Sequence, residues 1–159
     1  MSHTNILISG STNKTIIHGV ELCEKIIKGD GNCLYRSVAA SEANKDNYTH
    51  QELRDMTSKE IADNSEVYEQ KRTDEERKKE SIGDFSKRVG KDKEIAGHLE
   101  IGALARVLGC SFYVDDVEEK VLYPLQLPQD EDQQAIAVYL RLRHSGSNTL
   151  CHYNLLDNS

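Results

Sequence analysis

The sequence lacks any long apolar run, and this absence excludes one class of protein at once. A helix that crosses a membrane needs about 20 consecutive apolar residues, and every apolar run here is far shorter. The polar N-terminal residues also lack the basic start and apolar centre of a secretory signal peptide. We therefore expect a protein without a membrane span.

Closely spaced cysteines are absent as well. The chain has 159 residues and four cysteines, none of them in a Cys-x-x-Cys pair. Such spacing argues against a zinc site, and a chain of this length does not need a disulfide framework. A reducing compartment therefore fits the sequence. The cysteines are Cys23, Cys33, Cys110 and Cys151.

The sequence has no excess of positive charge. Lysine and arginine number 20 against 27 aspartates and glutamates, which gives a net charge of −7. Binding to phosphate depends chiefly on clustered positive charge, so we expect no nucleic-acid partner. An acidic surface suits a basic protein or peptide partner better.

Helical patterns occupy the first two-thirds of the chain, and strand patterns follow. Thr49 and Glu52 form a capping box that predicts a helix start, and Gly109 stands where a later helix should stop. This order predicts an α+β fold with a mixed or antiparallel sheet backed by helices. The predicted helices span 33–43, 49–64, 85–89 and 98–108, and the predicted strands span 5–9, 15–20, 111–115, 121–125 and 135–143.

One stretch joins a turn to the start of a helix. Gly29-Asp30-Gly31-Asn32 favours a turn, and the apolar-rich run that follows favours a helix, so Cys33 lies where the two meet. A thiol at a helix N-terminus is close to the positive end of the helix dipole, which favours the thiolate. By itself, however, such a cysteine is more often a small buried hydrophobic residue than a nucleophile.

A second stretch, near the end of the sequence, supplies the partners that a nucleophile requires. In an extended strand, residues i and i+2 point to the same face, so His152 and Asn154 are expected to lie side by side. A cysteine, a histidine and a carboxamide are the parts of a thiol protease triad. A packing role for Cys33 does not require these partners, and catalysis does, so their presence favours catalysis.

Both stretches resemble motifs of one family. The segment Asp30-Gly31-Asn32-Cys33-Leu34-Tyr35-Arg36 resembles the signature of the OTU (ovarian tumour) family of cysteine proteases, and His152-Tyr153-Asn154 resembles its C-terminal His-aromatic-Asn/Asp element. Residues 97–105 are similar to the helix between them. The family often carries a Trp before that helix, whereas this chain has Ala96 and no Trp. That difference affects local packing rather than the reacting groups.

The resemblance covers about residues 22–156 and implies the OTU-like, papain-related cysteine protease fold. In that fold a central mixed or antiparallel sheet is flanked by helices. The chain is then expected to consist of an N-terminal lead-in over residues 1–20 and a single catalytic domain over residues 21–159.

The activity implied by the resemblance is that of a deubiquitinase. Such an enzyme hydrolyses the isopeptide bond after the C-terminal glycine of ubiquitin or a ubiquitin-like modifier. Cys33 is implied to attack the carbonyl, His152 to accept and return the proton, and Asn154 to orient the imidazole. No metal or organic cofactor is implied.

The resemblance also assigns an oxyanion loop. Asp30 is implied to shape this loop, which includes Gly31 and Asn32. The amides of Asn32 and Cys33, and that of Gly31, are the expected donors to the oxyanion.

Contacts to the substrate are expected in two regions. The charged segment 66–80 fits a solvated helix; alternatively, it is an arm that contacts the substrate protein through Val67 and Tyr68. Asp115 and Asp116 are candidates to attract a modifier tail that carries arginines. The expected partners are ubiquitin, ubiquitin-like proteins and polyubiquitin chains. We expect a cytoplasmic monomer, in its own eukaryotic cell or in the host of a virus or bacterium.

Two other functions compete with this interpretation. A catalytically weak ubiquitin-binding module with the OTU fold would bind without hydrolysis, although all three residue types of the triad are present. A redox protein would use Cys33 but has no resolving cysteine nearby in sequence. Cys151 is the cysteine that could approach in space, because it adjoins His152.

Overall fold

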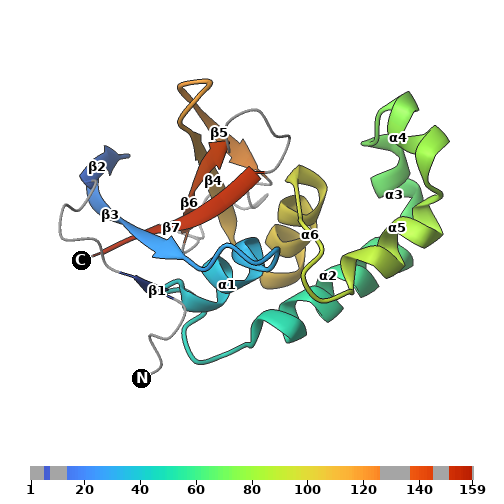
Figure 1. The fold of residues 1–159 in the computed structure, drawn as a ribbon, viewed down its shortest axis with the longest axis horizontal. Helices are drawn as coiled ribbons and strands as arrows, with labels where there is room; N and C mark the ends of the chain where they lie inside the picture. The colour runs from blue at the N-terminus through green and yellow to red at the C-terminus, as the bar shows by residue number, and fades with distance from the viewer. Residues whose placement is uncertain (1–5, 8–13, 126–136, 145–150, 159) are drawn as a thin grey trace.

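The computed structural model describes residues 6–7, 14–125, 137–144 and 151–158, and it has the predicted α+β architecture. A mixed sheet lies beside a layer of helices, and part of the helical layer extends away from the sheet (Figure 1). The helices are α1 (Cys33–Ala40), α2 (His50–Asp63), α3 (Ser65–Gln70), α4 (Asp74–Lys79), α5 (Ile82–Val89) and α6 (His98–Leu108). The strands are β1 (Ile6–Leu7), β2 (Lys14–Ile17), β3 (Val20–Ile27), β4 (Ser111–Asp116), β5 (Val121–Leu125), β6 (Ala137–His144) and β7 (Cys151–Asp157).

The sheet has the order β1-β3-β7-β6-β4-β5, and β2 pairs with β3 outside this path. β4 and β6 are parallel, and the other pairs are antiparallel, so the sheet is mixed as predicted. The single strand predicted over 15–20 is wrong. His18 and Gly19 both have positive φ, and their two-residue turn makes β2 and β3 a hairpin.

The two faces of the sheet differ in character because side chains alternate along each strand. Val138, Leu140 and Leu142 of β6 are buried in the main core with residues of α1, α2 and α6, so the alternation predicted for β6 is confirmed. The opposite face of the sheet carries a small apolar cluster of Ile17, Leu22 and Leu156 and, toward His152, polar side chains. There the register pairs Arg141 with Asn154 and Arg143 with His152.

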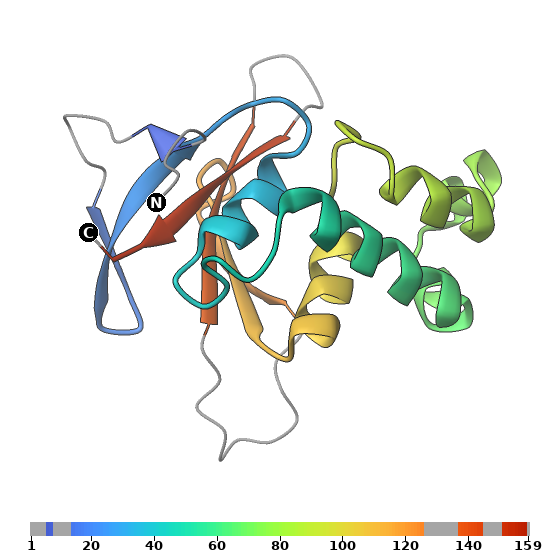
Figure 2. The ribbon, with the colours of Figure 1, turned by 90° about the horizontal axis from the view of Figure 1, so that it is seen from below.

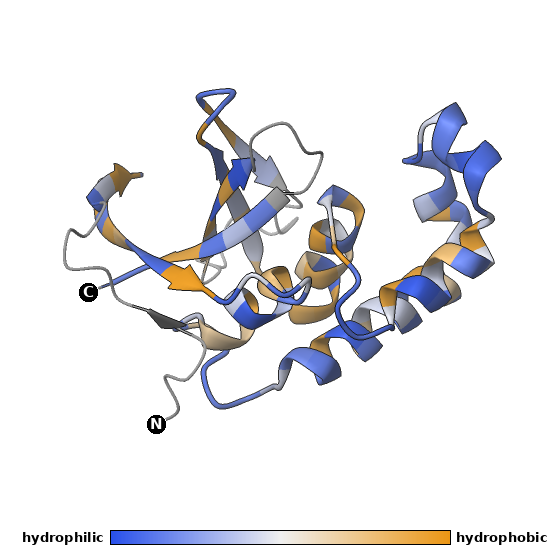
Figure 3. Cartoon of the chain, in the orientation of Figure 1, coloured by the Kyte–Doolittle hydropathy of each residue, from blue (hydrophilic) through white to orange (hydrophobic). Residues whose placement is uncertain are grey.

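The helices form two regions. α1 and α6 lie next to the sheet, whereas α3 and α4 lie at the far end of α2 (Figure 2). We call residues 65–89, which comprise α3, α4 and α5, the helical arm. α3 and α4 are mostly hydrophilic (Figure 3), and the arm is joined to α2 and α6 by a small second core. That core contains Ile61, Tyr68, Phe85, Val89 and Ala103.

The helix boundaries confirm some predictions and correct others. The capping box at Thr49 is present, and Gly109 ends α6 in the left-handed conformation. The prediction of one solvated helix over 66–80 is wrong, because Thr73 starts a separate helix with its own capping box. α1 ends at Ala40 rather than at residue 43, because Ser41 is extended.

Candidate active site

Cys33 is the first residue of α1, and its thiol is buried against β7. The backbone N–H of Tyr153 donates to Cys33 Sγ over 3.4 Å. Burial raises the pKa of the Cys33 thiol, and this effect outweighs the backbone amides of Tyr153 and Leu34, which lower it. The helix-start amide of Leu34 lowers the pKa of the thiol as expected, but burial outweighs it, so the thiol needs a base.

His152 and Asn154 lie side by side on the polar face of β7. His152 Nε2 is 2.6 Å from Asn154 Oδ1, and the same oxygen accepts from the backbone N–H of Ile27 over 2.9 Å. Because Asn154 Oδ1 can only accept, His152 Nε2 carries the proton and Nδ1 has the lone pair. A Cβ at Gly29 would lie 3.6 Å from Nδ1, so the ring rests on a glycine. The histidine is thus oriented as a base.

The two halves of the site are adjacent in space, because Tyr153 lies between His152 and Asn154 in the chain and contacts the thiol through its amide. Within the described residues, no hydrogen bond joins Cys33 Sγ to His152. Catalytic hydrogen bonds are often long in resting enzymes and shorten when the substrate binds. The missing hydrogen bond therefore does not exclude His152 as the base for Cys33.

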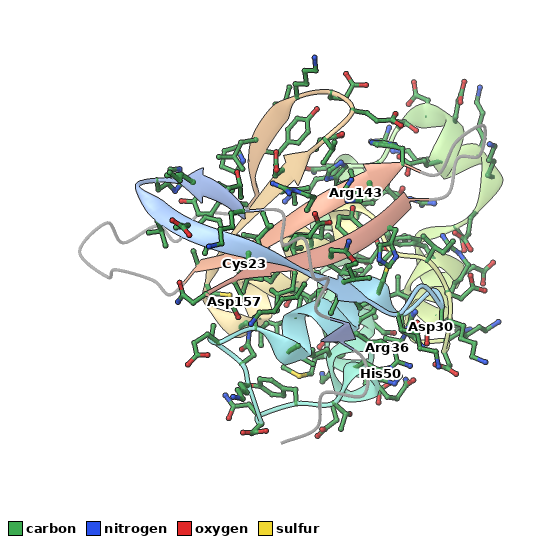
Figure 4. All side chains as sticks on the ribbon, turned by 60° about the vertical axis from the view of Figure 1, so that its left-hand side comes forward. Cys23, Asp30, Arg36, His50, Arg143 and Asp157 are labelled. Carbon is green, nitrogen blue, oxygen red and sulfur yellow. The ribbon has the colours of Figure 1, made fainter. Side chains whose placement is uncertain are left out.

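Asp30 stabilises the turn that precedes Cys33. Its carboxylate accepts two hydrogen bonds to Oδ2, from Arg36 Nη2 over 2.7 Å and from Nε over 3.1 Å, and Figure 4 shows the two residues together beside α1. Burial opposes ionisation of Asp30, but the Arg36 guanidinium and the Asn32 amide outweigh it and lower its pKa. Asp30 is thus an ionised support of the loop.

The Asn32 amide is already bonded within the loop. Its N–H donates to Asp30 Oδ1 over 3.1 Å, so the expectation that this amide donates to an oxyanion is wrong for this structure. The N–H of Cys33 comes first in α1, where helix geometry provides no acceptor. Cys33 N–H is therefore the amide best placed for the oxyanion.

Gly31 permits a close approach of two backbone segments. Its φ is +83°, and a Cβ there would lie 1.9 Å from the Lys93 carbonyl oxygen. Any other residue would clash with backbone that cannot easily move. The loop before Cys33 therefore requires glycine at this position.

Arg54 was not among the predicted site residues, yet it supports this loop from inside the protein. It is 0% exposed. Its guanidinium donates to Asn32 Oδ1 over 2.8 Å and to the carbonyls of Gly31 and Val89, each over 2.9 Å. It also donates to the carbonyl of Glu94. No local signal in the sequence marks Arg54, because its carbonyl partners come from other segments of the chain.

The two predicted substrate contacts on α3, Val67 and Tyr68, differ in their exposure. Val67 is exposed on α3. Tyr68 is 0% exposed, donates its hydroxyl to Glu60 and packs in the second core. It also lines the cavity described below, so its role as a substrate contact stays a prediction.

The two aspartates at the end of β4 have partners within the protein. Asp115 is 2.8 Å from Arg141. Asp116 is buried, lies 3.1 Å from His144 Nε2, and accepts from the amides of Glu118 and Glu119. Asp116 therefore stabilises the β4–β5 turn, and because it also lines the cavity described below, its role as a substrate contact stays a prediction. Asp115 stays a prediction.

A cavity of about 720 Å³ opens beside the site. It lies among the helical arm, the N-terminal end of α6 and the ends of β6 and β7, and Tyr153 contributes to its wall. Arg88 and His98 supply polar groups from the helical side. This cavity provides space for a peptide segment; Cys33 and His152 are not among its described lining residues, and Tyr153 connects it to the site.

In the part of the chain that the structure describes, no group of three or more His, Cys, Asp or Glu is arranged to hold a metal ion. None of the described helices combines the length and apolar character needed to cross a bilayer.

Comparisons with known proteins agree with the fold. The family model described as OTU-like cysteine protease matches residues 28–153. The structure of the OTUD1 OTU domain is 23% identical, with a TM-score of 0.65 and coverage of 85% of each chain. An OTU domain solved in complex with ubiquitin is 22% identical, with a TM-score of 0.62, and the match covers 98% of this chain and 77% of that one.

A viral OTU domain protease from Dera Ghazi Khan virus is 18% identical, with a TM-score of 0.58, and the match covers 92% of this chain and 95% of that one. Among curated protein sequences, none matches. At these identities, the likeness to solved structures shows the fold.

Proposed function

Because the chain belongs to the OTU-like cysteine protease family, we propose that it is an isopeptidase that releases ubiquitin or a ubiquitin-like modifier from proteins. One observation carries this proposal. His152 is held by Asn154 in the tautomer of a base, and the residue between them contacts the Cys33 thiol. A structural cysteine does not require such an arrangement.

The reaction follows from this geometry. His152 Nδ1 accepts the thiol proton, and Cys33 Sγ forms a bond to the carbonyl carbon after the modifier's terminal glycine. The carbonyl oxygen becomes an oxyanion, to which Cys33 N–H donates. The imidazolium then protonates the leaving lysine amine as the C–N bond breaks. Water, deprotonated by His152, hydrolyses the thioester and regenerates the thiol.

The substrate class is supported by two features. Among the similar structures is an OTU domain in complex with ubiquitin, and the cavity beside Tyr153 has room for an extended peptide tail. We propose that the modifier's C-terminal tail occupies this cavity and that Val67 of the helical arm contacts the modifier. Such conjugates are present in the cytosol, which is the compartment we propose.

The test is an active-site probe. Ubiquitin with a C-terminal electrophile is incubated with the protein, and the intact mass is measured. We expect one adduct, which is lost in Cys33→Ala and kept in Cys151→Ala. The second variant is a matched control, because it removes a cysteine adjacent to His152. Absence of an adduct with ubiquitin and its common relatives would falsify the proposal.

A ubiquitin-binding module of low activity is the second candidate. The raised pKa of the Cys33 thiol favours it, because a neutral thiol is a poor nucleophile. Binding of ubiquitin by Cys33→Ala, measured by calorimetry together with turnover by the unmodified protein, separates the two. Tight binding with no turnover identifies the module.

A further inference from the structure

Glu24 is a buried carboxylate that the mechanism above does not use. It lies on β3 and is 4% exposed. Its Oε2 accepts from Asn154 Nδ2 over 2.7 Å, across 130 residues of chain. A buried carboxylate is costly to retain, so its contact with the residue that orients His152 calls for an explanation.

Two arginines keep Glu24 ionised. Arg143 donates to both carboxylate oxygens, over 2.7 Å and 2.6 Å, and Arg141 Nη1 donates to Oε1 over 3.2 Å. The charges balance, because Arg141 also pairs with Asp115. Figure 4 shows Arg143 on β6, which lies beside β7. An ionised carboxylate can only accept hydrogen bonds, so its partner at residue 154 must donate.

The two ends of the Asn154 amide are therefore distinguished. Its oxygen accepts from Ile27 N–H and faces His152 Nε2, and its nitrogen donates to Glu24. Rotating the amide by 180° would place its oxygen against a carboxylate and its nitrogen against an N–H. Both contacts would be repulsive, so Glu24 and Ile27 together select one orientation.

We propose that Glu24 is a positioning residue, which fixes the Asn154 amide with its oxygen toward His152. Its negative charge also favours an amide over a carboxylate at position 154. The consequence for catalysis rests on the proposed isopeptidase function; the orientation of the amide does not. An aspartate at position 154 would place a second negative charge next to Glu24. A glutamine at position 24 would remove that repulsion and supply a donor.

The main test is a double-mutant cycle. Glu24→Gln, Asn154→Asp and the double variant are assayed with a fluorogenic ubiquitin C-terminal substrate, and kcat and KM are measured separately. We expect Asn154→Asp to lower kcat about tenfold with little change in KM. Glu24→Gln should lower kcat when residue 154 is asparagine and raise it when residue 154 is aspartate.

The decisive result is that Glu24→Gln changes kcat in opposite directions when residue 154 is asparagine and when it is aspartate. A purely structural role for Glu24 predicts that Glu24→Gln lowers kcat in both backgrounds, and that outcome overturns the proposal. Glu21→Gln is the matched control. It is the same substitution on the same strand, at an exposed glutamate that pairs with Lys14, and it should leave kcat unchanged. Thermal unfolding of every variant shows whether loss of the fold contributes.

A second readout does not depend on activity. The ¹⁵N chemical shifts of the His152 ring report which nitrogen carries the proton. We expect the Nε2–H tautomer in the unmodified protein and a mixture of tautomers in Glu24→Ala. Unchanged shifts in Glu24→Ala overturn the inference. If the ubiquitin probe gives no adduct but the shifts change as expected, the proposed function fails and the positioning role stands.

Discussion

The cysteine half and the histidine half of the site are stabilised by different means. Near Cys33, the loop is fixed by one buried guanidinium that donates to backbone carbonyls and to Asn32. Near His152, the support is a set of side-chain ion pairs on the polar face of the sheet, in which Glu24 reaches Asn154. The first arrangement fixes main chain, and the second fixes the direction of a side chain.

This difference corresponds to the two tasks that the proposed function assigns to the site. An oxyanion is stabilised by amides, so the backbone around Cys33 must be rigid. A base needs the correct tautomer and ring angle, so a hydrogen-bonded side chain is sufficient for His152. Damage to the first half should therefore affect the fold and the activity together. Damage to the second half should affect turnover with little effect on the fold.

The largest expected effect is that of Arg54→Met. Removal of the guanidinium leaves several buried carbonyl oxygens without donors, and each such loss costs about 1–3 kcal/mol. We expect the free energy of unfolding to fall by about 4 kcal/mol, together with loss of adduct formation, as measured by urea unfolding and the ubiquitin probe. Arg106→Met removes a half-exposed arginine from α6 and is the matched control. Equal stability of the two variants would refute the role of Arg54.

Next in size is Asn154→Ala. This variant removes the acceptor of His152 Nε2 but leaves the main chain of β7 in place. We expect kcat to fall about a hundredfold, with KM within about threefold of its original value, because orientation matters in the transition state. Steady-state kinetics on a fluorogenic ubiquitin substrate provide the measurement. A large rise in KM at unchanged kcat would assign Asn154 to binding instead.

Asp30→Asn should have a smaller, pH-dependent effect. The pKa of Asp30 is lowered in the folded protein, so its ionisation stabilises the fold above the unfolded value of about 3.9, and this contribution is lost as the pH falls through the folded pKa. We expect a cost of about 2 kcal/mol at pH 7 and a smaller one at pH 3. Urea unfolding at both pH values measures it.

The control for Asp30→Asn is Asp63→Asn, which removes an exposed carboxylate paired with Lys59 and should leave stability nearly unchanged. A cost at position 30 that is the same at both pH values would mean that the ion pair with Arg36 contributes nothing.

The smallest effect is expected for Thr49→Ala. Thr49 caps α2, the helix that carries Arg54, and its loss should cost about 1 kcal/mol of unfolding free energy. The rate of adduct formation should not change, because the cap lies at one end of α2 and the contacts of Arg54 remain. A slower adduct would show that the loop before Cys33 depends on the helix end as well.

Much of the fold follows from local patterns. The capping box at Thr49, the stop at Gly109 and the alternation along β6 are signals carried by neighbouring residues, and each predicted an element that the structure contains. The adjacency of His152 and Asn154 also follows from the period of a strand. These predictions succeeded because the information is local.

The remaining features depend on contacts between distant residues. β3 was not predicted as a strand, and Glu24 within it is buried only because Arg141 and Arg143 arrive from β6. Arg54 similarly needs carbonyl acceptors from two other segments. No local pattern shows that a charged residue has such partners, so Arg54 and Glu24 were missed. Cys33, His152 and Asn154, by contrast, were predicted from local motifs.

The position of Tyr153 between His152 and Asn154 has a consequence for the newly made chain. Its side chain is in the main core and its amide contacts the thiol, so β7, which completes the core, also carries His152. Cys33 precedes that strand by more than a hundred residues. During synthesis on the ribosome, Cys33 therefore lacks its partner His152 until β7 has been made, so under the proposed function the nascent chain stays inactive before it has folded.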